Sequence, residues 1–147
     1  ENVWERAVAH TKAIHDYDDA SPHFQWQRRV TVCDTDRLLG CGQVLALMAL
    51  DRSQSKRVRR LLVVGTQGVK ILSGEKARQV FKLPSSIFNV CHEENAYVFA
   101  GRGFGHGLGM SQWGARALAE GGYNAAQILA YYYKDVAVDS LISAPGI

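Results

Sequence analysis

The stretch "GRGFGHGLGMSQWGARALAEGG", residues 101–122, places a glycine at every odd position from Gly101 to Gly109. If this segment is extended, its side chains alternate, and the opposite face is bare backbone. Glycine is a poor strand former, so the pattern predicts that a neighbouring segment or a flat ligand such as a sugar ring approaches closely. The side chains expected on one face are those of Arg102, Phe104, His106, Leu108 and Met110.

The glycines run into a predicted helix from Ser111 to Glu120, which two further glycines stop. Free amides and the positive dipole end at its start favour an anionic or carbonyl oxygen. Ser111 and Gln112 add polar groups and Trp113 a stacking face, unless Ser111 is only the helix cap and Trp113 only core. His106 is a candidate base, hydrogen-bond donor or structural residue. The candidate substrate-binding residues are Arg102, Phe104, His106, Ser111, Gln112 and Trp113.

Two other chemistries do not fit the glycine stretch. The dinucleotide pattern G-x-G-x-x-G fails from each starting glycine, and no G-K-[ST] follows. The residues Cys91 and His92 stand at no recognisable ligand spacing from His106, so a metal site is not expected. We therefore expect no cofactor and no metal, and a glycine run used purely for close packing remains an alternative.

The composition is that of an ordinary globular domain. In 147 residues, 47% are hydrophobic and 21% charged, and the net charge is +3. This charge suits an anionic polymer but is too weak to argue for nucleic acid. No apolar run approaches the roughly 18 residues of a membrane span. The basic segment 51–60 is either a solvated turn and strand edge or a contact with an anionic glycan or wall polymer.

The pattern along the chain predicts an α+β fold of mixed short strands and hairpins with about four helices. Residues 16–29 look irregular, and a helix is expected from Asp34 to about Leu50. The three cysteines indicate buried thiols, with a Cys33–Cys41 disulfide as the alternative. Further strands are expected at 58–65, 68–72, 85–90 and 96–104, and further helices after Ser73 and Asn124.

The segment "GRGFGHGLGMSQWGARALAEGGYNAAQILAYYYKDV" resembles the C-terminal signature of the stage II sporulation protein D (SpoIID) family. That family includes the amidase enhancers of bacterial cell walls. "SGEKARQVFKLPSSIFNV" is similar more loosely, and so are "ENVW" and "SPHFQW" to the start of the family's second half. The resemblance implies that residues 1–147 are the C-terminal portion of one larger SpoIID-type domain, with its signature at 101–133.

The resemblance also implies a function. SpoIID enzymes are lytic transglycosylases that cut peptide-stripped peptidoglycan strands between N-acetylmuramic acid and N-acetylglucosamine, leaving 1,6-anhydro ends. Their acid is a glutamate in the N-terminal half, which nothing here matches, so no catalytic residue is assigned. We expect the glycan-binding half of such an enzyme, supported by Arg78 and Ser86 and located outside the cytoplasm. The alternative is a non-catalytic amidase enhancer or peptidoglycan-binding module, with a cell-wall amidase as partner.

Overall fold

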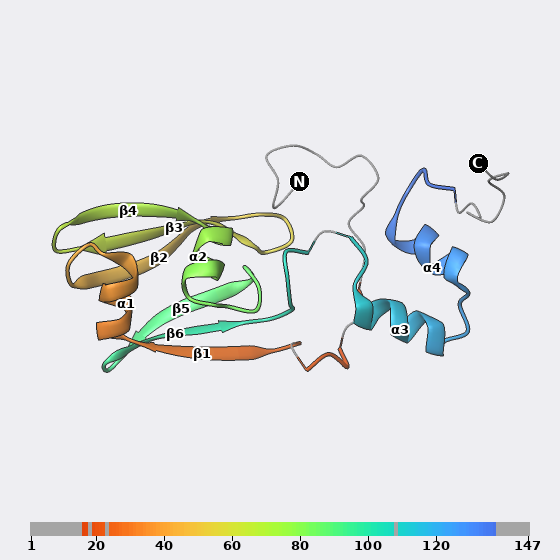
Figure 1. The fold of residues 1–147 in the computed structure, drawn as a ribbon, viewed down its shortest axis with the longest axis horizontal. Coiled ribbons are helices and arrows are strands. Elements are labelled where there is room, and N and C mark those ends of the chain that lie inside the picture. The colour runs from red at the N-terminus through yellow and green to blue at the C-terminus, as the bar shows by residue number, and fades with distance from the viewer. Residues whose placement is uncertain (1–15, 18, 23, 108, 138–147) are drawn as a thin grey trace, which may run out of the picture. The chain divides into compact units, whose positions relative to one another are not determined.

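The computed structural model describes residues 16–17, 19–22, 24–107 and 109–137. The chain divides into two compact units (Figure 1). Unit 1 consists of Glu1–Glu5 and Ser21–Gly107, and unit 2 of Arg6–Ala20 and Leu108–Ile147. The expectations for "ENVW" and for Leu108 lie outside the described residues.

Unit 1 contains two three-stranded antiparallel sheets and two short helices, α1 (Val32–Leu39) and α2 (Gly74–Val80). One sheet has the order β1-β6-β5, and the other has the order β2-β3-β4. Figure 1 shows the two sheets one above the other with α2 between them. The strands are β1 (Trp26–Thr31), β2 (Val44–Arg52), β3 (Val58–Gly65), β4 (Gly68–Ser73), β5 (Phe88–Glu93) and β6 (Ala96–Gly101).

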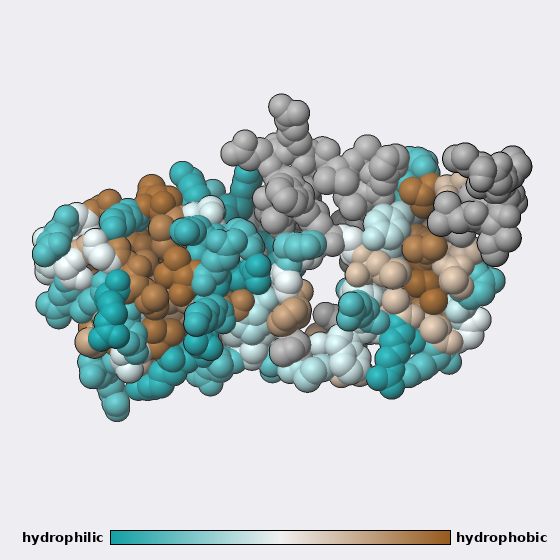
Figure 2. Space-filling view, viewed as in Figure 1, coloured by the Kyte–Doolittle hydropathy of each residue, from teal (hydrophilic) through white to brown (hydrophobic). Residues whose placement is uncertain are grey.

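The core of unit 1 joins both sheets and both helices. Phe99 of β6 is fully buried, with its ring centroid 4.6 Å from that of Phe81 and 5.6 Å from that of Phe88. Leu61 and Val63 of β3 are equally buried in the same cluster. Apolar residues also gather on the visible face over the β2-β3-β4 sheet in Figure 2. Burial of Phe99, Leu61, Val63 and the other residues of the core cluster, worth about 1.5–3 kcal/mol for each large side chain, is the main force that holds the sheets together.

Several predicted elements of unit 1 are confirmed. β3 and β4 form the expected hairpin around residues 66 and 67. Ser73 caps α2, because its hydroxyl accepts a hydrogen bond from the Lys76 amide. β5 and β6 pair antiparallel through the turn at Glu94 and Asn95. β5 begins and ends later than expected, at Phe88 and Glu93. β6 begins at Ala96 as expected but ends earlier, at Gly101.

The predicted helix from Asp34 to Leu50 is wrong beyond its first turns. α1 ends at Gly40, which adopts a left-handed conformation with φ of 54°. After this turn the Asp36 carboxylate accepts a hydrogen bond from the Val44 amide at 2.7 Å, and β2 begins. The apolar run that looks helical is instead a strand paired with β3. Tertiary pairing therefore overrides helix propensity after the glycine.

Two smaller expectations also need correction. Residues 16–29 are not wholly irregular, since β1 begins at Trp26 and pairs with β6. The three cysteines are free, which rules against the Cys33–Cys41 disulfide. Cys41 is a buried thiol as predicted, whereas Cys33 and Cys91 are exposed.

Unit 2 contains α3 (Gln112–Glu120) and α4 (Ala125–Tyr132), both close to their predicted bounds. Asn124 caps α4 with a full capping box, in which the Asn124 and Gln127 side chains each accept a bond from the other's amide. The Tyr132 hydroxyl donates to Asp16 at 2.7 Å, and the Tyr133 hydroxyl accepts from the Met110 amide at 3.1 Å. These tyrosines tie α4 to segments far from it in the sequence.

The four helices and two sheets of the described residues confirm the predicted α+β class. Across the same residues, none of the helices has both the length and the apolar character that a membrane crossing requires.

Candidate functional site

After the end of β6, the glycine stretch continues as a loop and not as an extended strand. β6 ends at Gly101, and the glycines at 103, 105, 107 and 109 have φ between 73° and 87°. This region of backbone conformation favours glycine, because a Cβ would clash with the chain. The predicted alternation of side chains across a flat strand is therefore wrong. The run of glycines serves a sharply turning loop whose residues 101–107 belong to unit 1.

Hydrogen bonds to Trp26 and to the adjacent residues Pro84 and Ser85 hold the backbone of this loop. The Ser85 hydroxyl donates to the Arg102 carbonyl at 2.6 Å, and the Trp26 indole donates to the Gly103 carbonyl at 3.0 Å. The Gly105 amide donates to the Pro84 carbonyl at 2.8 Å. Backbone groups that are bonded in this way cannot rearrange without losing about 1 kcal/mol each. The loop is thus a fixed feature of the surface.

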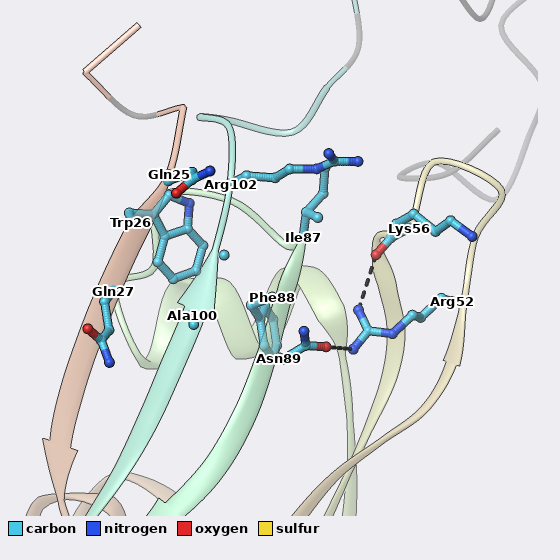
Figure 3. A pocket seen from close by; sticks show the side chains of 11 residues that line it. Gln25, Trp26, Gln27, Arg52, Lys56, Ile87, Phe88, Asn89, Ala100 and Arg102 are labelled. Carbon is cyan, nitrogen blue, oxygen red and sulfur yellow. Dashed lines mark hydrogen bonds between the residues drawn. The ribbon is translucent and has the colours of Figure 1, made fainter. Parts of the chain in front are cut away.

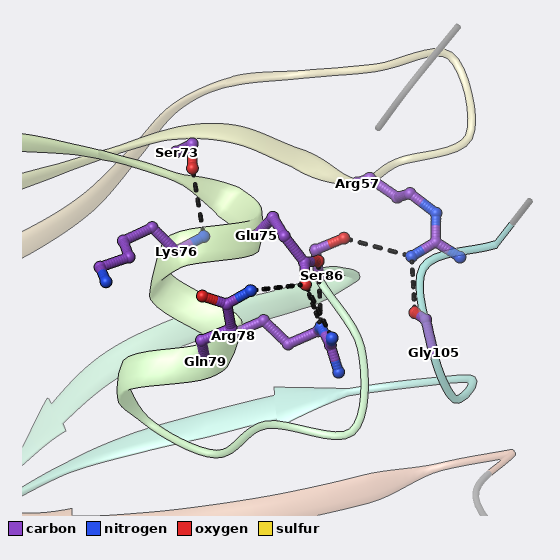
Figure 4. A network of polar contacts seen from close by, with 8 residues as sticks. All are labelled: Arg57, Ser73, Glu75, Lys76, Arg78, Gln79, Ser86 and Gly105. Carbon is purple, nitrogen blue, oxygen red and sulfur yellow. Dashed lines mark hydrogen bonds and ion pairs between the residues drawn. The ribbon is translucent and has the colours of Figure 1, made fainter. Parts of the chain in front are cut away.

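Arg57 is a buried charged residue that also supports the loop (Figure 4). Its guanidinium donates to the Ser86 hydroxyl at 3.1 Å and to the Gly105 carbonyl at 3.3 Å. The residue is only 8% exposed, and this burial lowers the pKa of its guanidinium, an effect that nearby Glu75 partly offsets. A Cβ added at Gly107 would run into the same guanidinium. The loop and Arg57 are therefore packed directly against each other.

The side chains of the loop point outward from this supported backbone. Arg102, Phe104 and His106 are all exposed, Phe104 to 68%. Phe104 thus offers an accessible aromatic face beside the polar side chains of Arg102 and His106. The structure therefore places three of the six predicted binding residues on one supported loop.

Arg78 and Ser86, expected to support the site, lie in two neighbouring parts of the network in Figure 4. Arg78 forms an ion pair with Glu75 at 2.7 Å, and Ser86 binds Arg57. The hydrogen bond from Arg78 is the main reason why the pKa of Glu75 is lowered, and His106 adds a smaller effect in the same direction. A general acid needs a raised pKa, so Glu75 has the opposite tuning.

The other glutamates in the part of the chain that the structure describes form ion pairs at the surface. Glu93 and Glu94 pair with Arg29, at 3.3 Å and 3.9 Å. Glu120 pairs with Arg116 one helical turn away, at 2.7 Å. Each of these carboxylates is therefore engaged with an arginine.

The remaining predicted binding residues, Ser111, Gln112 and Trp113, belong to unit 2. The Ser111 hydroxyl accepts from the Gly114 amide at 3.1 Å and caps α3, as the simpler interpretation proposed. Gln112 is exposed, and Trp113 is half-buried with the Arg116 guanidinium 5.5 Å from its ring centroid. Their role in binding stays a prediction.

Sequence reasoning missed Arg57 and Ser85. Arg57 stands in a run of basic residues with nothing local to distinguish it, and its burial follows only from the packing of the loop. Ser85 carried one weak signal, its place directly after Pro84 and before a strand. Its bond to the Arg102 carbonyl spans 17 positions, which no local pattern reveals.

Comparison with known proteins now adds to this geometry. Residues 5–109 match the family described as "Domain of unknown function (DUF8618)", and the chain belongs to this family.

Named relatives lie in the SpoIID group. Stage II sporulation protein D of Bacillus amyloliquefaciens is 29% identical over 150 residues, which are 97% of this chain and 42% of the relative. Stage II sporulation protein D of Bacillus subtilis (strain 168) is 28% identical, over 91% of this chain and 39% of the relative. The amidase enhancer of Bacillus subtilis (strain 168) is 43% identical over 61 residues, 42% of this chain and 8% of the relative. The predicted resemblance to the SpoIID family is confirmed, and the chain spans about two fifths of the length of its SpoIID relatives.

Proposed function

We propose that this chain forms the glycan-binding part of a protein that acts on peptidoglycan outside the cytoplasm. The observation that carries the proposal is the supported loop, in which Arg102, Phe104 and His106 are exposed on a backbone held from behind. The similarity to proteins named for sporulation and for enhancing an amidase supports the same assignment.

The chemistry of the loop suits a sugar polymer. An exposed aromatic ring covers the apolar face of a sugar, while arginine and histidine donate to hydroxyl and acetamido oxygens. Because the loop's backbone is already bonded, binding does not have to order it first, and this saves conformational entropy. The glycine loop therefore combines a stacking surface with polar groups at little cost of ordering.

The activity that we propose for the whole protein is lytic transglycosylation of peptide-stripped strands, with 1,6-anhydro products. In this mechanism an acid protonates the glycosidic oxygen as its bond to the anomeric carbon breaks, and the muramic 6-hydroxyl attacks that carbon and loses its proton to the conjugate base of the acid. The described glutamates are engaged in ion pairs, and Glu75 has a lowered pKa. In this proposal the chain therefore binds and orients the strand, and the acid comes from another part of the protein.

The second candidate is a non-catalytic enhancer of a cell-wall amidase. One observation favours it, the 43% identity to an amidase enhancer over 61 residues, which is higher than the identity to either SpoIID relative. In this case the same loop would bind the wall but serve an amidase partner.

Binding is tested by titrating peptide-stripped glycan strands into the chain by calorimetry. Phe104→Ala and His106→Gln should each weaken binding about tenfold, the equivalent of one good contact. His92→Gln, at an exposed histidine of β5, and Tyr123→Ala, at an exposed tyrosine, are the matched controls and should bind normally. Equal losses in variants and controls, or no binding by the original chain, would rule out the loop as a glycan site.

Activity is tested by mass spectrometry of 1,6-anhydro-muramic ends. The chain alone and the chain joined to whatever coding sequence lies upstream of it are compared on the same strands. Anhydro ends from the joined form, reduced by His106→Gln, support the transglycosylase. A joined form that binds glycan, makes no anhydro ends and stimulates an amidase supports the enhancer instead.

A further inference from the structure

A second feature of unit 1 lies beside the glycine loop, at one end of the β1-β6-β5 sheet. It is an open hollow of about 840 Å³, shown in Figure 3. Its floor is formed by the ends of β1, β6 and β5, and its side by the segment that joins β2 to β3. This places part of the basic segment 51–60 next to Arg102, at the start of the loop.

Three cations line the hollow, and the described residues that line it include no Asp or Glu. Arg52 and Lys56 come from the basic segment, and Arg102 from the glycine loop. All three are exposed. Positive side chains gathered without acidic neighbours raise the local concentration of anions and repel cations. The positive charge of the hollow therefore favours binding of a negatively charged group.

Arg52 is held in position within this cluster. Its guanidinium donates to the Asn89 side-chain oxygen at 2.8 Å and to the Lys56 carbonyl at 3.2 Å, as the dashed lines in Figure 3 show. Arginine presents five N–H donors in a planar fork, so two bonds leave further donors for a ligand. A guanidinium fixed in this way loses less entropy when it binds a carboxylate.

The floor of the hollow offers groups that suit a sugar. Gln27, Ala100 and Asn89 stand side by side on the three strands, so the small alanine lies between two amides. Because the Asn89 oxygen accepts from Arg52, the nitrogen of its amide remains as a donor. Trp26 adds an indole edge, and its N–H is already bonded to the Gly103 carbonyl. The hollow thus sets amide groups and an aromatic ring beside the three cations.

We propose that this hollow is the subsite for a carboxylate carried on a sugar of the bound glycan, held by Arg52, Lys56 and Arg102. This inference rests on the proposed function and makes it more specific. In a peptide-stripped strand the lactyl group of muramic acid ends in a free carboxylate, whereas in an intact strand an amide replaces it. The site would therefore distinguish stripped from intact strands by charge.

A phosphate of an anionic wall polymer shares the chemistry of this carboxylate, so the test separates the two sources. Three ligands are titrated into the chain: peptide-stripped glycan, a neutral N-acetylglucosamine oligomer of similar length, and inorganic polyphosphate. The main variant is Arg52→Gln with Lys56→Asn. Asparagine suits the left-handed backbone at Lys56, where φ is 64°.

Matched controls keep the charge change equal. Arg59→Gln with Lys76→Asn removes the same two charges from exposed positions of unit 1 outside the hollow. Lys56→Asn alone leaves the Arg52 guanidinium in place and retains the carbonyl that it binds. Thermal melts of all variants show whether the fold survives.

The double variant should bind stripped glycan about tenfold more weakly, with a smaller salt dependence, and should bind the neutral oligomer as before. Lys56→Asn alone should show part of this loss. Equal losses in the variant and its matched control, an equal loss for the neutral oligomer, or tighter binding of polyphosphate than of stripped glycan would each overturn the carboxylate subsite. In these cases glycan binding by the original chain would leave the proposed function standing. An original chain that binds neither glycan would overturn both.

Discussion

Unit 1 and unit 2 are built in different ways, although one stretch of glycines runs through both. Among the described residues, the core cluster of unit 1 contains thirteen buried residues drawn from two sheets and two helices. The corresponding cluster of unit 2 contains three, Leu118, Ile128 and Tyr132. Unit 1 thus depends on a large core drawn from distant segments, whereas the described part of unit 2 combines a small core and helix caps with single long-range bonds, such as that from Tyr132 to Asp16.

The two units also differ in how the residues of the candidate site are held in place. In unit 1 the loop at 101–107 is fixed by bonds to distant segments, such as that from Trp26 to Gly103, which are 77 positions apart. In unit 2, Ser111 and Asn124 each cap their own helix within three positions. Long-range bonds need a folded core before they can form, so the loop's rigidity depends on the core of unit 1.

The largest effect should come from the core of unit 1. Phe99→Ala removes a fully buried ring that contacts Phe81 and Phe88, and it should reduce the free energy of unfolding by about 3–5 kcal/mol. Phe104→Ala, which removes an exposed ring, should leave stability within about 0.5 kcal/mol. Urea denaturation followed by circular dichroism measures both, and similar losses in the two variants would contradict the described core.

A pair of glycines in the loop tests the packing against Arg57. Gly103 and Gly107 share a positive φ of 73°, so alanine is strained at both. Only at Gly107 would the added methyl meet the Arg57 guanidinium, whereas the space at Gly103 is open. Gly103→Ala should cost about 1 kcal/mol and Gly107→Ala about 1–3 kcal/mol. Thermal melts compare them, and an equal cost would mean that Arg57 does not pack against the loop.

The cap of α4 tests how far unit 2 depends on local signals. Asn124→Ala removes the side-chain oxygen that accepts from the Gln127 amide, which is one half of the capping box. The loss of helix stability should be about 1 kcal/mol. Asn124→Ser, which can still cap, is the control and should restore most of it. Hydrogen exchange of the α4 amides reports the change, and unchanged exchange in the alanine variant would speak against the cap.

The smallest effect concerns the ion pair between Glu75 and Arg78. The pKa of Glu75 is lower in the folded protein than its ordinary value of 4.5. The Glu75 carboxylate therefore stabilises the fold at pH values above 4.5, and this stabilisation is lost as the pH falls through the folded-state pKa. Glu75→Gln should therefore lower stability near neutral pH, by less than about 1 kcal/mol because the pair is partly exposed. Melting temperatures of the two proteins should converge below pH 4.5. Curves that stay parallel down to pH 3 would show that the pair contributes nothing.

Several parts of the fold could be predicted because their signals are local. Ser73, Ser111 and Asn124 each precede a helix that they cap, and the turn at residues 66 and 67 stands between two strand-forming runs. The failed helix from Asp34 to Leu50 shows the opposite case. Its apolar run is compatible with helix or strand, and pairing with β3 decided between them.

The candidate site also has features that the sequence predicted and features that it did not. The glycine stretch indicated unusual backbone and the residues Arg102, Phe104 and His106, because the pattern itself is visible in the sequence. Its actual conformation, a turning loop with positive φ, was not predictable from alternation alone. The hollow required Arg52 and Arg102 to line the same surface, although 50 positions separate them.

The α+β class, the caps at Ser73, Ser111 and Asn124, the main hairpins and the family to which the signature points could all be predicted from the sequence alone. This was possible because these features depend on neighbouring residues or on a long and specific motif. Only the tertiary structure decided that Arg57 is buried under the loop while Arg52 and Lys56, in the same basic segment, line an open hollow. The physical reason is that burial and charge clustering depend on which distant segments pack together. The residue type alone does not indicate which residues surround an arginine in the folded protein.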